Sequence, residues 1–398
     1  MKNRLQELGI LFSLLLFCLG AWWGLFTMKQ DVWKRWVYRP TFLAVFIMVT
    51  WSVVFGLRFG ANPLFSFFAS REFFFIFLCP AIYLMWHAGL DIKTLRRVCW
   101  AAIFMLMLNY LFFYFTMDLE AAFFSPEPTV SSLVTLDSWR GFRLKPPLYG
   151  IMVGILMSIM MIFSGYSKRH TFAAIIVFTT GAYIWSIVQF RSTLATMLLS
   201  SLAYYFITAH YNRLPLLWSA IASGLVVVPI LVILLNSGGK DEVEQGEVDA
   251  VRAEAFAAAF ESRKERPLWG VGKASAYSIT YQDLEFPKFF PDDIGLVGMT
   301  YIYGGVGISI YLYFHFMILY RLWSTNWQYK EIVGKHEPLI WGIFIWMCAQ
   351  TLNLVLNPGL AYGKGITIAS IGLALCAIYR HMLHSGRLMR EKEQLKYF

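Results

Sequence analysis

The sequence predicts an all-α integral membrane protein, a polytopic bundle of about 11–12 transmembrane helices with one large extramembrane loop. Of the 398 residues, 58% are hydrophobic and only 15% are charged, whereas a soluble domain carries about 25% charged residues. Apolar windows of about 17 to 25 residues recur along the chain, and each is long enough to cross a bilayer as a helix. Runs such as Ile10–Phe17 and Ile151–Phe163 are apolar without the alternation of a membrane β-barrel strand.

The expected spans divide the chain into three parts. Residues 1–235 form an N-terminal transmembrane bundle, residues 236–293 a polar loop, and residues 294–398 C-terminal transmembrane helices with a basic tail. The spans expected before the loop are Leu8–Thr27, Thr41–Leu57, Glu72–His87, Val98–Thr116, Leu148–Ser164, Thr171–Phe190, Ser192–Ala209 and Pro215–Leu235. Those after it are Ile294–Tyr320, Pro338–Leu356 and Gly365–His384.

Positive residues cluster in alternate connecting segments, and this predicts the orientation. Lys and Arg in short loops resist translocation, so the basic segments are expected on the cytoplasmic side and the polar loop on the outer side. The same bias explains the formal net charge of +10 without nucleic-acid binding, which would need a folded basic module. The five cysteines lie in or beside spans, without metal-ligand spacing, so we expect no metal site. The basic segments are Lys29–Arg39, Lys93–Arg97, Lys168–Arg169, Arg213, Arg321–Lys335 and Arg380–Lys396.

The polar loop holds the best-defined pattern outside the spans. Apolar residues recur at three- and four-residue intervals from about Val248 to Glu265, which predicts an amphipathic helix that ends before Pro267. Arg252 lies on the edge of its apolar face, and Arg266 opens the run Arg266-Pro267-Leu268-Trp269-Gly270-Val271-Gly272. A solvated surface pair with nearby acidic residues is the alternative interpretation for Arg252.

Three further arginines fall on the same predicted outer side. Arg191 stands between two apolar segments with almost no loop, where a charge is costly and a function is the default expectation. Arg143 lies in a cationic stretch before a span, and either phospholipid headgroups or an anionic ligand accounts for it. Arg71 precedes a span, and an interfacial anchor is its alternative interpretation. Several guanidinium groups on one membrane face suit a diphosphate, because their geometry matches phosphate oxygens bidentately.

Asp292 and Asp293 immediately precede a predicted span. A carboxylate at a helix start ordinarily caps backbone N–H groups. The second interpretation is that one of these residues is the base that takes a proton from a hydroxyl nucleophile. Glycines at 295, 298, 304, 305 and 307 in that helix predict close packing or access for a lipid chain.

Together these residues resemble the signature region of the O-antigen ligase and Wzy-type polymerase superfamily. The similarity rests on Arg252, the run Arg266–Gly272, the stretch Asp292–Gly298 followed by Tyr303–Gly307, and the junction Phe190–Ala195. The resemblance implies a membrane-embedded, inverting, metal-independent glycosyltransferase of the C type that needs no cofactor. Its substrate would be an undecaprenyl-diphosphate-linked oligosaccharide at the periplasmic face of a bacterial inner membrane. Arg191 and Arg252 would bind the diphosphate, with Arg143, Arg71 and Arg266 as further candidates.

One departure from the pattern favours a polymerase within that superfamily. Ligases carry a histidine near the position of Asp292 and Asp293, and this chain has none there. The expectation is therefore a polymerase of lipid-linked glycan repeat units, with a chain-length regulator as a further partner. A ligase that transfers the glycan to lipid A–core is the alternative. A transporter or flippase of a lipid-linked or anionic solute is the alternative from outside the enzymes. That alternative predicts ionisable residues within the spans, and the spans hold few of them.

Overall fold

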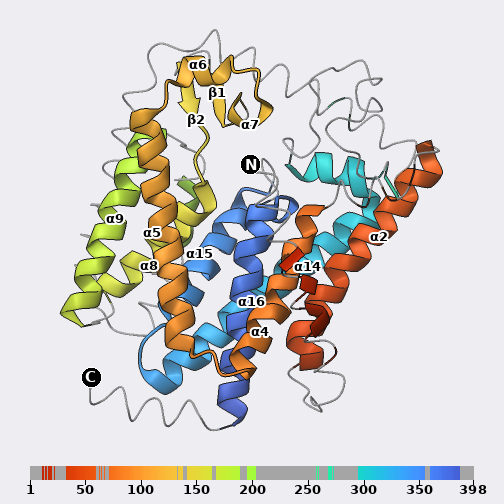
Figure 1. The fold of residues 1–398 in the computed structure, drawn as a ribbon. Helices are drawn as coiled ribbons and strands as arrows, with labels where there is room; N and C mark the ends of the chain where they lie inside the picture. The colour runs from red at the N-terminus through yellow and green to blue at the C-terminus, as the bar shows by residue number, and fades with distance from the viewer. Residues whose placement is uncertain are drawn as a thin grey trace.

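Helices dominate the structure, a computed structural model (Figure 1). The helices with ten or more described residues are α2 (Arg39–Phe59), α4 (Leu78–His87), α5 (Ile92–Thr116), α8 (Leu148–Phe163), α9 (Lys168–Val188), α14 (Gly295–Val333), α15 (Pro338–Leu352) and α16 (Gly363–His384). The structure describes residues 11–12, 14–15, 17–19, 22, 33–59, 62, 64, 67, 71–131, 133–137, 141–163, 167–188, 195–202, 257, 259, 268–270, 272, 295–354 and 359–385.

Several of these helices have the dimensions of membrane spans. At a rise of about 1.5 Å per residue, about 20 apolar residues cross the hydrocarbon core. The sequence-based expectation of an α-helical membrane protein is therefore confirmed, while the total number of spans stays a prediction. The segments long and apolar enough to span are Arg35–Val54, Ile92–Thr116, Lys168–Val188, Gly295–Val333 and Gly363–His384, and α8 and α15 are shorter apolar helices.

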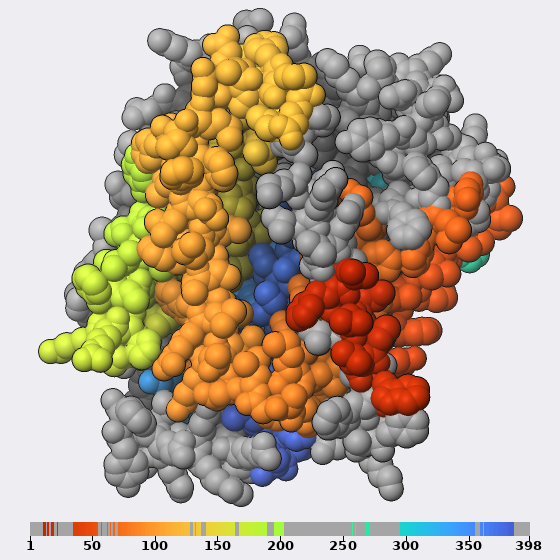
Figure 2. Space-filling model, viewed as in Figure 1, coloured from red at the N-terminus to blue at the C-terminus, as the bar shows by residue number. Residues whose placement is uncertain are grey.

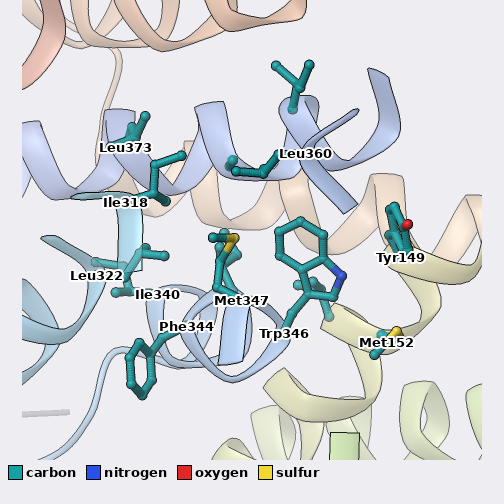
Figure 3. Packing of buried hydrophobic residues seen from close by; sticks show 14 of the residues in the cluster. Tyr149, Met152, Ile318, Leu322, Ile340, Phe344, Trp346, Met347, Leu360 and Leu373 are labelled. Carbon is teal, nitrogen blue, oxygen red and sulfur yellow. The ribbon is translucent and has the colours of Figure 1, made fainter. Parts of the chain in front are cut away.

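Helix α16 forms the centre of the bundle and is the most buried of the candidate spans. It contacts α4, α14, α15, α8 and two short helical elements, the π-helix η1 (Trp33–Tyr38) and the 3₁₀-helix η2 (Arg71–Phe77). The core lies where α14, α15 and α16 meet α8 (Figure 3), and Trp346, Met347, Leu373 and Met152 are almost completely buried there. Helix α5, by contrast, lies at the periphery and is largely exposed on the face seen in Figure 2.

A small antiparallel hairpin caps the upper end of the bundle in Figure 1, where the sequence predicts only a loop. Strands β1 (Val134–Asp137) and β2 (Gly141–Leu144) pair with Thr135 opposite Arg143, next to the short helices α6 (Leu119–Phe123) and α7 (Pro128–Ser131). Four-residue strands carry almost no periodicity, so their pairing depends on contacts such as those of the Phe142 ring, whose centroid lies 5.4 Å from that of Phe123. We call this the hairpin end.

Side-chain contacts join the helix termini at the opposite end. The Arg96 guanidinium of α5 lies 3.8 Å from Glu337 Oε1, beside the start of α15. The Tyr83 hydroxyl of α4 lies 3.2 Å from His381 Nδ1 of α16. The structure thus gathers at one end the basic segments that the sequence assigns to one side of the membrane, and we call it the basic end. The described basic residues near these termini are Arg35, Arg39, Lys93, Arg96, Arg97, Lys168, Arg169, Lys330, Lys335 and Arg380.

Candidate functional site: a backbone lock at a break in α14

Helix α14 is broken at Gly304, within its first third. The Gly304 backbone has φ 64° and ψ −173°, which is far from the helical region and is reached mainly by glycine. In an uninterrupted helix the N–H of Val306 would donate to the carbonyl of Ile302, four residues earlier. At this break both groups find their partner elsewhere in the protein, in the glycine motif of the polar loop.

The segment Leu268–Gly272 replaces the missing helical hydrogen bond on both sides of the break. The Gly272 N–H donates to the Ile302 carbonyl at 2.8 Å, and the Val306 N–H donates to the Leu268 carbonyl at 3.1 Å. A buried backbone group without a partner is costly in a membrane, where water does not reach it. The loop segment therefore stabilises the broken helix, and the break in turn fixes the loop. We call this arrangement the backbone lock.

Glycine is required at the two positions where the backbones cross. A Cβ at Gly270 would lie 2.5 Å from the Ile302 carbonyl oxygen and 2.6 Å from the Gly304 nitrogen. A Cβ at Gly304 would meet the Leu268 carbonyl and, at 2.5 Å, the Gly270 nitrogen. Both residues also have positive φ angles. The sequence-based prediction that glycines in this helix permit close packing is confirmed at Gly304, and the packing partner is the loop motif.

Trp51 of α2 contacts both the loop segment and the broken helix. Its indole Nε1–H lies 2.8 Å from the Tyr303 carbonyl and 3.2 Å from the Trp269 carbonyl, so one donor serves both the helix and the loop. The Trp51 side chain is only 1% exposed, and its ring contacts the Tyr303 ring edge-on at 5.7 Å between centroids. A Cβ at Gly307 would lie 2.8 Å from Trp51 Cε2, so glycine admits the indole there.

Two further hydrogen bonds join helix ends to neighbouring segments. The N–H of Leu296, in the first turn of α14, donates at 3.0 Å to the carbonyl of Leu354 after α15. Glu72 Oε2 in η2 accepts from the Gly363 N–H at the start of α16, at 2.7 Å. The first contact ties the start of α14 to the end of α15, and the second ties η2 to the start of α16.

Two of the predicted site residues are described, and they lie in different elements. Arg71 is exposed in the first turn of η2, next to Glu72. Arg143 lies in β2, where its Nε and Nη1 atoms are buried, and it interacts electrostatically with Tyr110 of α5. The buried guanidinium atoms argue against a purely solvated surface cation at this position. Five other predicted residues lie outside the described part of the chain, namely Arg191, Arg252, Arg266, Asp292 and Asp293.

Some residues of the lock can be recognised as unusual from the sequence, and others cannot. The glycine run and Gly304 stand out as glycines in a loop and in a span. Trp51, however, sits inside an apolar span and resembles any other membrane-embedded aromatic residue. Glu72 opens a predicted span, and only its contact with Gly363 shows its role. Of the expected amphipathic helix at 248–265, only Ala257 and Ala259 are described; both are helical, and Ala259 is buried.

The polar groups available in the lock are backbone N–H and carbonyl groups and the Trp51 indole, while the described cations Arg71 and Arg143 lie in other elements. No group of three or more His, Cys, Asp or Glu side chains among the described residues could hold a metal ion. Comparison with protein-family models and with curated proteins finds no match to this chain.

Proposed function

We propose that this protein is a glycosyltransferase that polymerises lipid-diphosphate-linked glycan repeat units at the membrane face of the hairpin end. The observation that supports this most directly is the backbone lock. The lock joins the loop motif to α14. Leu268, the first described residue of the motif, lies two positions after Arg266, and Gly295, the first residue of α14, lies two positions after Asp293. The described residues that follow Arg266 and Asp293 in the sequence are thus anchored to one another.

In the proposed reaction an acceptor hydroxyl oxygen attacks the anomeric carbon of the donor sugar. The bond from that carbon to the diphosphate oxygen breaks, its electron pair leaves with the lipid diphosphate, and the anomeric configuration inverts. Asp293 or Asp292 takes the proton of the hydroxyl group. Arg191 and Arg252 stabilise the negative charge that grows on the diphosphate, because fixed cations contribute most where charge develops. Arg143, Arg71 and Arg266 are further candidates for binding the diphosphate.

The experiment is to replace the two central arginines and measure polymer length in cells. Arg191→Ala and Arg252→Ala are expected to abolish long chains at unchanged protein levels, whereas Arg191→Lys retains a positive charge and part of the activity. Arg97→Ala, an exposed cation of α5 at the basic end, is the matched control and keeps wild-type chain lengths. Wild-type chain lengths in both alanine variants would overturn the proposal.

A ligase differs from a polymerase in its acceptor. Purified protein is incubated with lipid-linked oligosaccharide alone and, separately, with added lipid A–core. A polymerase lengthens the lipid-linked glycan without the core, whereas a ligase forms product only when the core is present.

The break in α14 raises a second candidate function, that of a transporter, because broken membrane helices often line substrate sites in transporters. In such sites the freed backbone groups face the solute. In this protein the freed Ile302 carbonyl accepts from the Gly272 N–H, and the freed Val306 N–H donates to the Leu268 carbonyl of the same chain. The break therefore favours a structural lock over a solute site.

A further inference from the structure

Two arginines lie against the ring of one tryptophan at the basic end, and two more are nearby. The Arg321 guanidinium carbon of α14 lies 5.0 Å from the centre of the Trp36 ring, and that of Arg380 of α16 lies 5.4 Å from it. Arg39, at the start of α2, lies within electrostatic range of Arg321. Arg35 precedes Trp36 in η1 and is exposed. We call Trp36 and these four arginines the Trp36 cluster.

The inner members of the cluster are held by neutral groups. Arg321 is 8% exposed, and its Nη1 and Nη2 donate to the carbonyls of Trp36 and Arg35 at 3.0 and 2.6 Å. Arg380 Nη1 donates to the side-chain oxygen of Gln328. These bonds orient the guanidinium groups but do not neutralise their charge. Positive charge from α2, α14 and α16 is therefore brought together beside η1, whose Arg35 and Trp36 carbonyls hold Arg321.

Two of the described carboxylates at this end, Glu337 and Glu331, are engaged elsewhere, while Asp91 is exposed in front of α5. Glu337 Oε2 accepts from the Ile340 N–H at 2.6 Å, and its Oε1 faces Arg96. Glu331 accepts from the Trp327 indole N–H at 2.8 Å. Within the described ranges, none of the contacts of the four cluster arginines involves a carboxylate. Like charges held together at a membrane surface are stabilised by an anion from outside the chain.

We propose that the Trp36 cluster is a binding site for the phosphate headgroup of an anionic phospholipid. Basic pockets between membrane helices bind such headgroups, and tryptophan is enriched at the depth where headgroups meet hydrocarbon. Arg35 and Arg39 are exposed and reach the headgroup, while Arg321 and Arg380 hold the indole and supply charge behind it. The apolar side chains of Tyr38 and Phe42, which are exposed on the same stretch, lie alongside the acyl chains.

The test measures lipid retention by the full-length protein in mixed detergent micelles, with native mass spectrometry as the readout. Phosphatidylglycerol is the anionic probe and phosphatidylcholine the zwitterionic one. Each removed guanidinium is expected to weaken phosphatidylglycerol binding about fivefold, the contribution of one cation near an anionic lipid surface. The variants are Arg39→Gln and Arg380→Gln, and Arg39 is the safer one because its exposed side chain makes no described packing contact in the core.

The matched control is Arg97→Gln, which removes an exposed cation of α5 at the same end but outside the cluster. We expect it to keep wild-type affinity. The proposal would be overturned if the wild type retained phosphatidylcholine as well as phosphatidylglycerol. It would also be overturned if Arg97→Gln lost as much phosphatidylglycerol affinity as Arg39→Gln, because the lipid would then respond to the overall positive charge of the surface and not to the cluster. Inorganic phosphate serves as a competitor, and displacement of the lipid by millimolar phosphate would mean a free-anion site instead.

Discussion

Trp51 shows how one side chain connects distant parts of the chain. Its single indole N–H reaches carbonyls of residues 218 and 252 positions away, in the polar loop and in α14. Both carbonyls belong to the region where backbone hydrogen bonding is interrupted, so they depend on donors from outside the helix. Trp51 therefore stabilises the backbone lock through its polar atom as well as through its apolar ring.

Trp51→Phe separates these two contributions, because phenylalanine keeps a ring but removes the N–H. We expect a loss of about 1–3 kcal/mol, the usual cost of leaving buried polar groups under-satisfied. Thermal unfolding in detergent at a fixed scan rate measures it. Trp327→Phe is the control, since its N–H bonds Glu331 at an exposed position, and it should cost under about 1 kcal/mol. Equal stability of Trp51→Phe and wild type would contradict the role assigned to the N–H.

His336 is a second residue whose environment has a measurable consequence. It lies in the turn between α14 and α15 and is 7% exposed. Burial, with the Lys330 ammonium as the smaller cause, lowers the pKa of His336 from 6.5 to about 3. Between these two values the unfolded chain binds a proton that the folded protein does not. Acidification through that window therefore favours the unfolded state.

This linkage predicts a loss of roughly 1 kcal/mol of stability from His336 between pH 7.5 and pH 5.5. His336→Gln should remove that part of the acid sensitivity, because glutamine does not titrate. The measurement compares apparent melting temperatures of both proteins at the two pH values. His384→Gln, at the exposed end of α16, serves as the control and should retain the wild-type response. An unchanged pH response in His336→Gln would refute the assignment.

At the scale of elements, α14 combines two helices whose interrupted hydrogen bond is replaced by bonds to the polar loop. Its bend at Gly304 is a local backbone conformation, but its stability comes from the segment Leu268–Gly272. The β hairpin has the same character, since β1 and β2 are too short to be stable alone and depend on neighbours such as Phe123. Both elements exist because another part of the chain completes their hydrogen bonds or covers their side chains.

Gly304→Ala tests the lock at the level of the element. The new methyl group would meet backbone atoms of Leu268 and Gly270, which cannot move without opening the lock, and the positive φ adds strain. We expect a loss above about 4 kcal/mol or failure to fold, as for other overpacked backbone contacts. Gly334→Ala isolates the cost of a positive φ, because φ is +86° there and no atom lies within 4 Å of the place that the new methyl group would occupy.

For Gly334→Ala the expected cost is only about 1–2 kcal/mol, the penalty of a left-handed conformation for a residue with a Cβ. Folded yield in detergent and thermal unfolding provide the comparison. Similar losses in the two variants would mean that strain alone, and not the contact with the loop, accounts for glycine at position 304.

At the scale of the whole molecule, charge is distributed unevenly along the bundle axis. The described lysines and arginines near the helix termini of the basic end outnumber its acidic residues Asp91, Glu331 and Glu337. The hairpin end has a more even balance, with Asp118, Glu120 and Glu127 beside Arg143 and Lys145. Positive residues favour the cytoplasmic side during insertion. The hairpin end is therefore expected to face outward, which is the side that the proposed reaction requires.

Cysteine labelling in intact cells tests this orientation. In a background with the native cysteines replaced by alanine, Glu120→Cys near the hairpin is expected to react with a membrane-impermeant maleimide. Arg97→Cys at the start of α5 should react only after the membrane is permeabilised. Both side chains are exposed, so access differs by side and not by burial. The reverse pattern would place the proposed site on the wrong side of the membrane.

The sequence by itself determined the membrane class, the helical nature of the described spans and the gathering of positive charge, because hydropathy and charge act along the chain and need no partner. It also marked Gly270 and Gly304 as unusual, without showing what each one contacts. Only the tertiary structure decided that the backbones at these two glycines are in contact and that Trp51 donates a hydrogen bond beside them. It also decided that arginines from two separate helices lie against Trp36. The physical reason is that these contacts join residues far apart in sequence, and their formation depends on how the helices pack.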